Sequence, residues 1–150
     1  MKKNIIYVLT ACALLVLFLF GMYSIFLNGF FTPPKHPITY TNATADNIKV
    51  TFPIPDAVVG KEFLVTGSAR GTWFFEASFP VEVLDKDGKV LVATPAQAEG
   101  EWMTPDFVPF KADIKIPDSY TGPATLVLNR DNPSDLPQNA ASISFPITIK

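Results

Sequence analysis

The side chains that most often perform catalysis are scarce in this chain of 150 residues. It has one histidine, His36, in a Pro/Thr-rich stretch, and one cysteine, Cys12, in an apolar stretch. No Ser-His-Asp, Cys-His or histidine-rich metal arrangement can be assembled from these two. Glu76 and Glu101 could form an acid–base pair, but glutamates on strands are usually solvated. We therefore expect a protein that is not an enzyme and has no cofactor or metal.

Three segments combine aromatic, charged and amide side chains in a way that suits binding. They are residues 70–76, with three consecutive aromatics, residues 101–110 and residues 130–137. Three consecutive aromatics cannot all be buried on one face of a strand, because successive side chains point to opposite faces. In the structural alternative, the aromatics only cap the open end of a core, and Asn, Asp and Pro only fix the shape of loops.

Short runs that alternate apolar and polar residues predict the elements that position these segments. No stretch keeps a helical period, and Gly, Pro, Asp and Asn separate the runs. The pattern predicts an all-β, immunoglobulin-like sandwich of about seven strands, with a barrel as the alternative. Residues 85–88 are expected to form a hairpin turn rather than a calcium loop, and Phe79 to lie in the core. The predicted strands are residues 48–52, 62–69, 75–83, 89–94, 110–116, 124–129 and 143–149.

An uncharged apolar run over residues 5–27 precedes the predicted sandwich. A helix of about 23 residues is roughly 34 Å long, which is enough to cross a bilayer. Lys2 and Lys3 precede the run and favour a cytoplasmic N-terminus. We expect one N-terminal transmembrane helix, an uncleaved signal anchor over residues 1–28. The protein would then be a single-pass protein of the cell membrane with an extracytoplasmic C-terminal part.

Two alternatives for this segment are a cleaved signal peptide and a lipoprotein signal in which Cys12 is lipidated. Both alternatives also place the rest of the chain outside the cytoplasm. A Pro/Thr-rich linker is expected over residues 29–46 and the sandwich over residues 47–150. The exported part has no cysteine, so its core must hold it together without a disulfide. Its net charge of about −4 argues against nucleic acid as a partner.

Four motifs in order resemble a known family. They are residues 73–81, the Asp87-Gly88 pair, residues 101–104 with 107–110, and residues 131–134. Together they resemble the immunoglobulin-like domain of bacterial spore germination, the Gmad family, over residues 48–149. The resemblance implies an immunoglobulin-like fold in an extracytoplasmic, often membrane- or lipid-anchored setting, and no reaction, cofactor or catalytic residue. One departure is Asp135, where the family tends to have a glycine.

The loops after the second, fourth and sixth predicted strands should lie at one end, because consecutive strands alternate in direction. These loops contain the three unusual segments, so we expect a binding module for an envelope protein or a glycan. A structural spacer or assembly domain is the alternative. Glu76 is expected to accept a hydrogen bond from an arginine of these loops or from a backbone N–H group near Trp102. The candidate ligand-binding residues are Arg70, Trp73, Glu76, Trp102, Met103, Arg130, Asn132 and Ser134.

Overall fold

The computed structural model describes residues 15–17, which are helical, and residues 35–150. One compact unit spans Pro34–Lys150. Apart from residues 15–17, the predicted transmembrane segment lies outside the described residues. Within the described part of the chain, no helix is long and apolar enough to cross a membrane.

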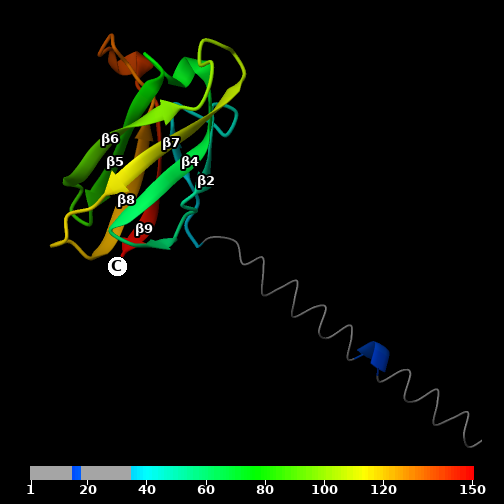
Figure 1. Cartoon of the computed structure of the whole chain (residues 1–150), viewed down its shortest axis with the longest axis vertical. Helices are drawn as coiled ribbons and strands as arrows, with labels where there is room; N and C mark the ends of the chain where they lie inside the picture. Colours follow the sequence, from blue (N-terminus) through cyan, green and yellow to red (C-terminus); the bar gives the residue numbers. More distant parts are fainter. Residues whose placement is uncertain (1–14, 18–34) are drawn as a thin grey trace, which may run out of the picture. The chain divides into compact units, whose positions relative to one another are not determined.

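The domain is built from β-strands, as the alternating pattern predicts (Figure 1). All seven predicted strands are present, with bounds that differ by a few residues. Two very short strands, β1 and β3, were not predicted. The strands are β1 (Thr39–Thr41), β2 (Ile48–Phe52), β3 (Val58–Val59), β4 (Glu62–Arg70), β5 (Ser78–Asp85), β6 (Val90–Ala98), β7 (Phe107–Lys115), β8 (Gly122–Asn129) and β9 (Ser142–Ile149). Two 3-10 helices, η1 (Gly71–Trp73) and η2 (Pro137–Asn139), lie in loops.

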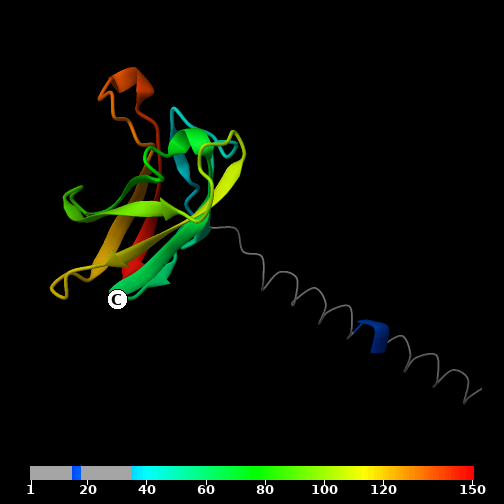
Figure 2. The ribbon, with the colours of Figure 1, turned by 45° about the horizontal axis from the view of Figure 1, so that its top comes forward.

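The strands form one continuous sheet in the order β1-β9-β8-β5-β6-β7-β4-β2. All pairs are antiparallel except β3, which runs parallel to β9. Strand β6 pairs with β5 along most of its length and reaches β7 only at Gln97 and Ala98 (Figure 2). The sheet therefore curls over at β6 into an immunoglobulin-like sandwich. Among the described strands, β2 and the β1–β9 edge are not paired with each other, so the sheet is not a closed barrel.

The core lies between the inward faces of the curled sheet. Phe79 is fully buried, which confirms its predicted place. Its ring packs edge-on against Phe110, with ring centroids 4.9 Å apart. Strand β7 shows why the alternating pattern was informative. Every second residue from Val108 to Ile114 is apolar and buried, while the residues between them are exposed.

Within the segment expected to be a linker, residues 29–46, several described residues contact the sandwich. Residues 39–41 form β1 and pair with β9. The backbone N–H and ring Nδ1 of His36 contact the two carboxylate oxygens of Asp56 at 2.9 and 2.6 Å. These His36 contacts lower the pKa of Asp56. Strands β1 and β3 form along the edge of β9 because the backbone N–H and C=O groups of that edge need hydrogen-bond partners.

Candidate functional site

Four loops gather at one end of the sandwich, at the top of Figure 1. We call this region the loop end and define it as residues 42–47, 70–77, 99–106 and 130–141. The backbone N–H of Asp131 donates to the carbonyl of Trp73 at 3.1 Å, and that of Gly71 donates to the carbonyl of Asp106 at 3.2 Å. The three segments singled out in the sequence therefore do converge.

Gly71 sets how closely two of these loops approach. A Cβ atom at this position would lie 2.0 Å from the carbonyl oxygen of Thr104 and 2.2 Å from that of Trp102. Both distances are far below any real carbon–oxygen contact, and both neighbours are backbone atoms. Only glycine allows this approach, so η1 and the β6–β7 loop are fixed against each other.

Trp73 is a core residue rather than an exposed anchor, since it is 3% exposed. Its ring lies edge-on to Phe79 at a centroid distance of 6.4 Å, and the buried Phe74 lies 5.2 Å from the same ring. The indole Nε1 of Trp73 is buried without a hydrogen-bond partner among the described residues, as is Nε of Arg130. The apolar anchors predicted at this end are thus divided between the core and the surface.

Arg70 holds the loops together. Its Nε donates to the carbonyl of Asp46 at 3.0 Å, and its Nη1 donates to the carbonyl of Pro105 at 3.2 Å. The guanidinium also lies over the ring of Phe107, 4.2 Å from the centroid. These contacts use two donors and one face of the guanidinium inside the protein.

Asn132 and Ser134 are also engaged internally. Asn132 Nδ2 donates to the carbonyl of Leu136 at 2.9 Å, and the hydroxyl of Ser134 donates to Asn132 Oδ1 at 2.6 Å. Asn139 Nδ2 then donates to the Ser134 hydroxyl at 3.0 Å. Asp135 has a φ of 53°, in the region that favours glycine, which agrees with the glycine that the family tends to have at this position. This network gives the β8–β9 loop its shape.

The prediction that Glu76 accepts a hydrogen bond from the neighbouring loops was wrong. Phe75 and Ser78 exchange two backbone hydrogen bonds of 2.9 and 3.0 Å, and Glu76 and Ala77 between them have φ values of 49° and 61°. These are the features of a type I′ turn. The chain reverses here before β5 begins, so strand alternation does not extend to Glu76. Its side chain is exposed and makes no hydrogen bond or ion pair with any described residue.

Met103 and Trp102 remain as candidate contact residues at the surface. Met103 is 74% exposed and Trp102 is half-buried. Glu101 Oε1 accepts the backbone N–H of Met103 at 3.0 Å, which fixes the backbone of this loop. Both side chains border an open, mostly apolar cavity of about 350 Å³. Its lining is Gly71, Thr72, Phe74, Trp102, Met103, Thr104 and Pro105.

The sequence did not identify every exposed apolar residue of this region. Phe75 is 43% exposed although alternation placed it in the core, and Leu136 is also exposed. The type I′ turn explains Phe75, because it precedes the strand proper. The run of three aromatics was the signal available, since one of the three had to leave the core.

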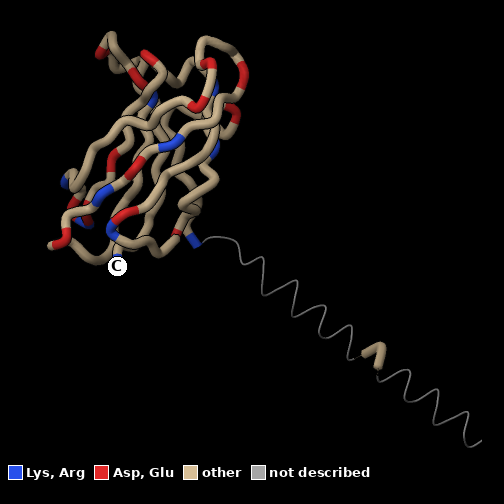
Figure 3. Tube along the Cα trace, viewed as in Figure 1, with Lys and Arg blue, Asp and Glu red and all other residues tan. Residues whose placement is uncertain are grey.

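The loop end is acidic. It contains seven carboxylate side chains and two arginines, of which Arg70 is engaged as described. Red segments accordingly outnumber blue ones at the top of Figure 3. Within the described part of the chain, no group of three or more potential metal ligands gathers in one place. The surface around Met103 therefore combines apolar side chains with net negative charge.

The scan against family models matches residues 47–136, which span β2 to the β8–β9 loop, to the immunoglobulin-like domain of bacterial spore germination, Gmad2. The chain belongs to this family. The match covers more than half of the chain and includes all eight candidate residues. Searches of curated proteins and of solved structures found no match.

Proposed function

We propose that this Gmad2 chain is a membrane-anchored, extracytoplasmic binding module and not an enzyme. The loop end is the binding surface, and a protein of the cell envelope is the partner. The observation that supports this most directly is the exposed side chain of Met103 at the border of an apolar cavity. Exposed apolar groups on loops fixed to a rigid scaffold are characteristic of interaction sites.

A protein partner is favoured over a glycan because most polar candidates are already engaged. Arg70 donates to carbonyls of two neighbouring loops, and Asn132 and Ser134 direct their hydrogen bonds to groups of their own loop. A glycan needs several free donors and acceptors around an exposed aromatic ring, whereas an apolar side chain of a protein needs mainly an apolar cavity. The cavity beside Met103 meets the second requirement better.

The anchor proposal rests on the sequence. The uncharged residues 5–27 are long enough to cross a bilayer, and Lys2 and Lys3 favour a cytoplasmic N-terminus. This orientation exports the domain, as would a cleaved signal or a lipid on Cys12. The negative charge of the domain disfavours nucleic acid as a partner.

A structural spacer or assembly domain is the second candidate. The burial of Trp73 and the internal bonds of Arg70 favour it, because both residues stabilise the loops rather than project from them. The two candidates differ in what Met103 contacts. A spacer leaves this side chain in water, and a binding module buries it against a partner.

Photo-crosslinking in the host envelope distinguishes the two. A photoreactive residue replaces Met103 in the full chain, and a matched variant carries it at Val90, which is also exposed but lies beside the Asp85–Gly88 turn at the other end of β5. We expect a discrete protein adduct from position 103, none from position 90, and its loss when Trp102→Ala is added. Equal labelling from both positions would contradict a binding role for the loop end.

A further inference from the structure

Two prolines face each other on the outer surface of the sheet. Pro80 of β5 is paired with Pro95 of β6, and both are exposed. Directly opposite residues of an antiparallel pair point to the same face, so the two rings stand side by side. Neither can donate a ladder hydrogen bond, and pairing of β5 with β8 stops one residue away, at Val81.

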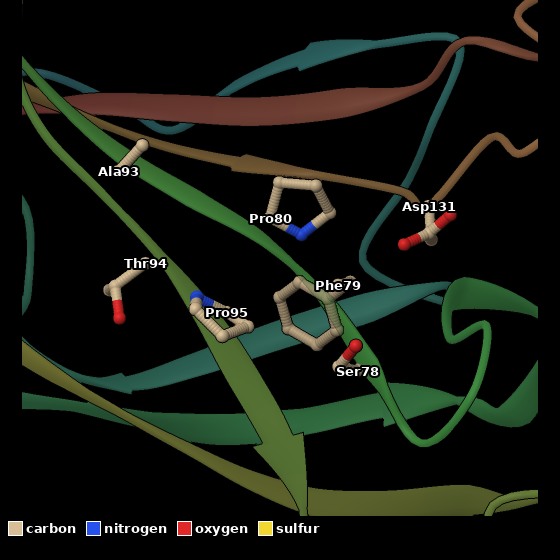
Figure 4. Close-up of a pocket in the computed structure, with 7 residues that line it drawn as sticks. All are labelled: Ser78, Phe79, Pro80, Ala93, Thr94, Pro95 and Asp131. Atoms are coloured by element: carbon tan, nitrogen blue, oxygen red, sulfur yellow. The ribbon is translucent and has the colours of Figure 1, made fainter.

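A shallow slot of about 290 Å³ lies over these prolines. Figure 4 shows Pro80 and Pro95 between Thr94 on one side and Asp131 on the other. The backbone N–H of Asp131 donates to the carbonyl of Trp73 at 3.1 Å, which fixes the main chain of Asp131 beside the slot. The slot is lined by Ser78, Phe79, Pro80, Ala93, Thr94, Pro95 and Asp131.

The charge of the slot is negative and unbalanced. The Asp131 carboxylate forms no ion pair and accepts no side-chain hydrogen bond from any described residue. Glu82 lies two residues after Pro80 on the same face and accepts only a neutral donor, Asn129 Nδ2, at 3.3 Å. A group that combines an apolar stem with a positive head would complement both the rings and the carboxylate.

We propose that this slot binds the alkylammonium side chain of a lysine on a partner protein. The methylene stem packs on the rings of Pro80 and Pro95, and the ammonium group pairs with Asp131. The slot shares no lining residue with the cavity beside Met103, so the proposal stands whether or not that cavity binds a partner.

An NMR titration of the full 15N-labelled chain in detergent micelles tests this. The probe is Nα-acetyl-lysine N-methylamide, with the norleucine analogue as a control that keeps the stem and lacks the charge. We expect saturable shifts of the amides of Ser78, Thr94 and Asp131, with a Kd on the order of 1 mM for so small a ligand. The norleucine analogue should bind about tenfold more weakly.

Two variants in the same loop identify the charged partner. Asp131→Asn keeps the backbone bond to Trp73 and should weaken lysine-probe binding about fivefold to tenfold. Asp135→Asn, which changes a carboxylate outside the slot, should leave the affinity unchanged. Equal binding of the norleucine analogue, unchanged affinity in Asp131→Asn, or shifts confined to another surface would each overturn the proposal.

Discussion

Two turns at opposite ends of β5 are built in different ways. The turn at Asp85–Gly88 has a glycine at a φ of 81°, and Asp85 Oδ1 accepts the N–H groups of Asp87 and Lys89, both at 2.9 Å. The turn at Phe75–Ser78 has two residues with positive φ, Glu76 and Ala77, and neither is glycine or asparagine. Local chemistry is sufficient to explain the first turn and insufficient to explain the second.

The difference shows that packing overrides local preference at the loop end. Left-handed conformations cost roughly 1–2 kcal/mol for each residue other than glycine. Phe74 precedes the strained turn and Phe79 follows it, and their rings meet in the core. Burying one such ring stabilises a protein by about 1.5–3 kcal/mol, so the pair is sufficient to offset two strained residues. The turn closes because the aromatics on either side pack together.

The largest expected effect comes from removing one of those rings. Phe79→Ala should lower the free energy of unfolding by about 3–5 kcal/mol, since it leaves a cavity against Phe74 and Phe110. Chemical denaturation of a fragment beginning near Thr32 measures this. We expect that fragment to fold alone, because the core lies within Pro34–Lys150.

Phe75→Ala is the matched control for this variant. It removes the same side chain from the strained turn itself, but from a position that is 43% exposed, so its effect should be much smaller. Similar losses for the two variants would mean that the aromatic cluster does not determine the turn.

The contrast between the two turns also explains what the sequence could predict. The seven longer strands and the turn at residues 85–88 were predictable because alternation and Asp-Gly chemistry act locally. Strands β1 and β3 have three and two residues, too few for any period, and depend on the exposed edge of β9. The turn at Glu76 and Ala77 contains no glycine, asparagine or other residue typical of turns, so the sequence did not predict it. The predicted third strand therefore began too early.

The sequence predicted where the candidate site lies but not which of its side chains are exposed. The direction of consecutive strands was enough to bring the three loops to one end. The direction of individual side chains depends on contacts between loops, which no alternation rule describes. Trp73 therefore turned out to be buried, and Asn132 and Ser134 turned out to bond to their own loop.

The next largest effect is expected from Gly71→Ala, which tests whether the loops of the loop end are as tightly fixed as their backbone contacts indicate. Gly71→Ala should destabilise the domain by about 1–3 kcal/mol, because the new Cβ would overlap the carbonyl oxygens of Trp102 and Thr104. Gly60→Ala is the control, since the nearest atom to its Cβ is 4.0 Å away. Thermal melts of the two variants should differ clearly, and equal melts would show that the β6–β7 loop moves aside at little cost.

A smaller effect, of opposite sign, is expected inside the strained turn. Ala77→Gly relieves the left-handed strain at a φ of 61° and adds chain entropy to the unfolded state, so a net gain of about 0.5–1 kcal/mol is expected. Ala93→Gly, in an ordinary strand position of β6, should instead destabilise by a similar amount. Denaturation midpoints measure both. A loss of stability in Ala77→Gly would show that the turn is not strained.

The smallest effect is a pH dependence of stability at the Asp85–Gly88 turn. The N–H group of Lys89, followed by that of Asp87, holds the pKa of Asp85 below its usual value. The stability that Asp85 contributes is therefore fully present above its unfolded pKa of about 3.9, and it is lost as the pH falls through the lower folded pKa. Asp85→Asn should melt below the parent by a constant margin between pH 5 and 7, and this margin should shrink once the pH falls below about 4.

Glu76→Gln completes the comparison at the other turn. Its carboxylate accepts no hydrogen bond from the described residues, so this variant should melt like the parent at pH 7. The remaining shifted carboxylates, Asp56 and Glu62, are the same in parent and variant, so they cancel in each difference. A margin for Asp85→Asn that persists unchanged at pH 3 would mean that the asparagine amide, rather than the lost charge, disturbs the turn. The two turns would then differ in backbone conformation, and the charge of neither carboxylate would contribute to stability.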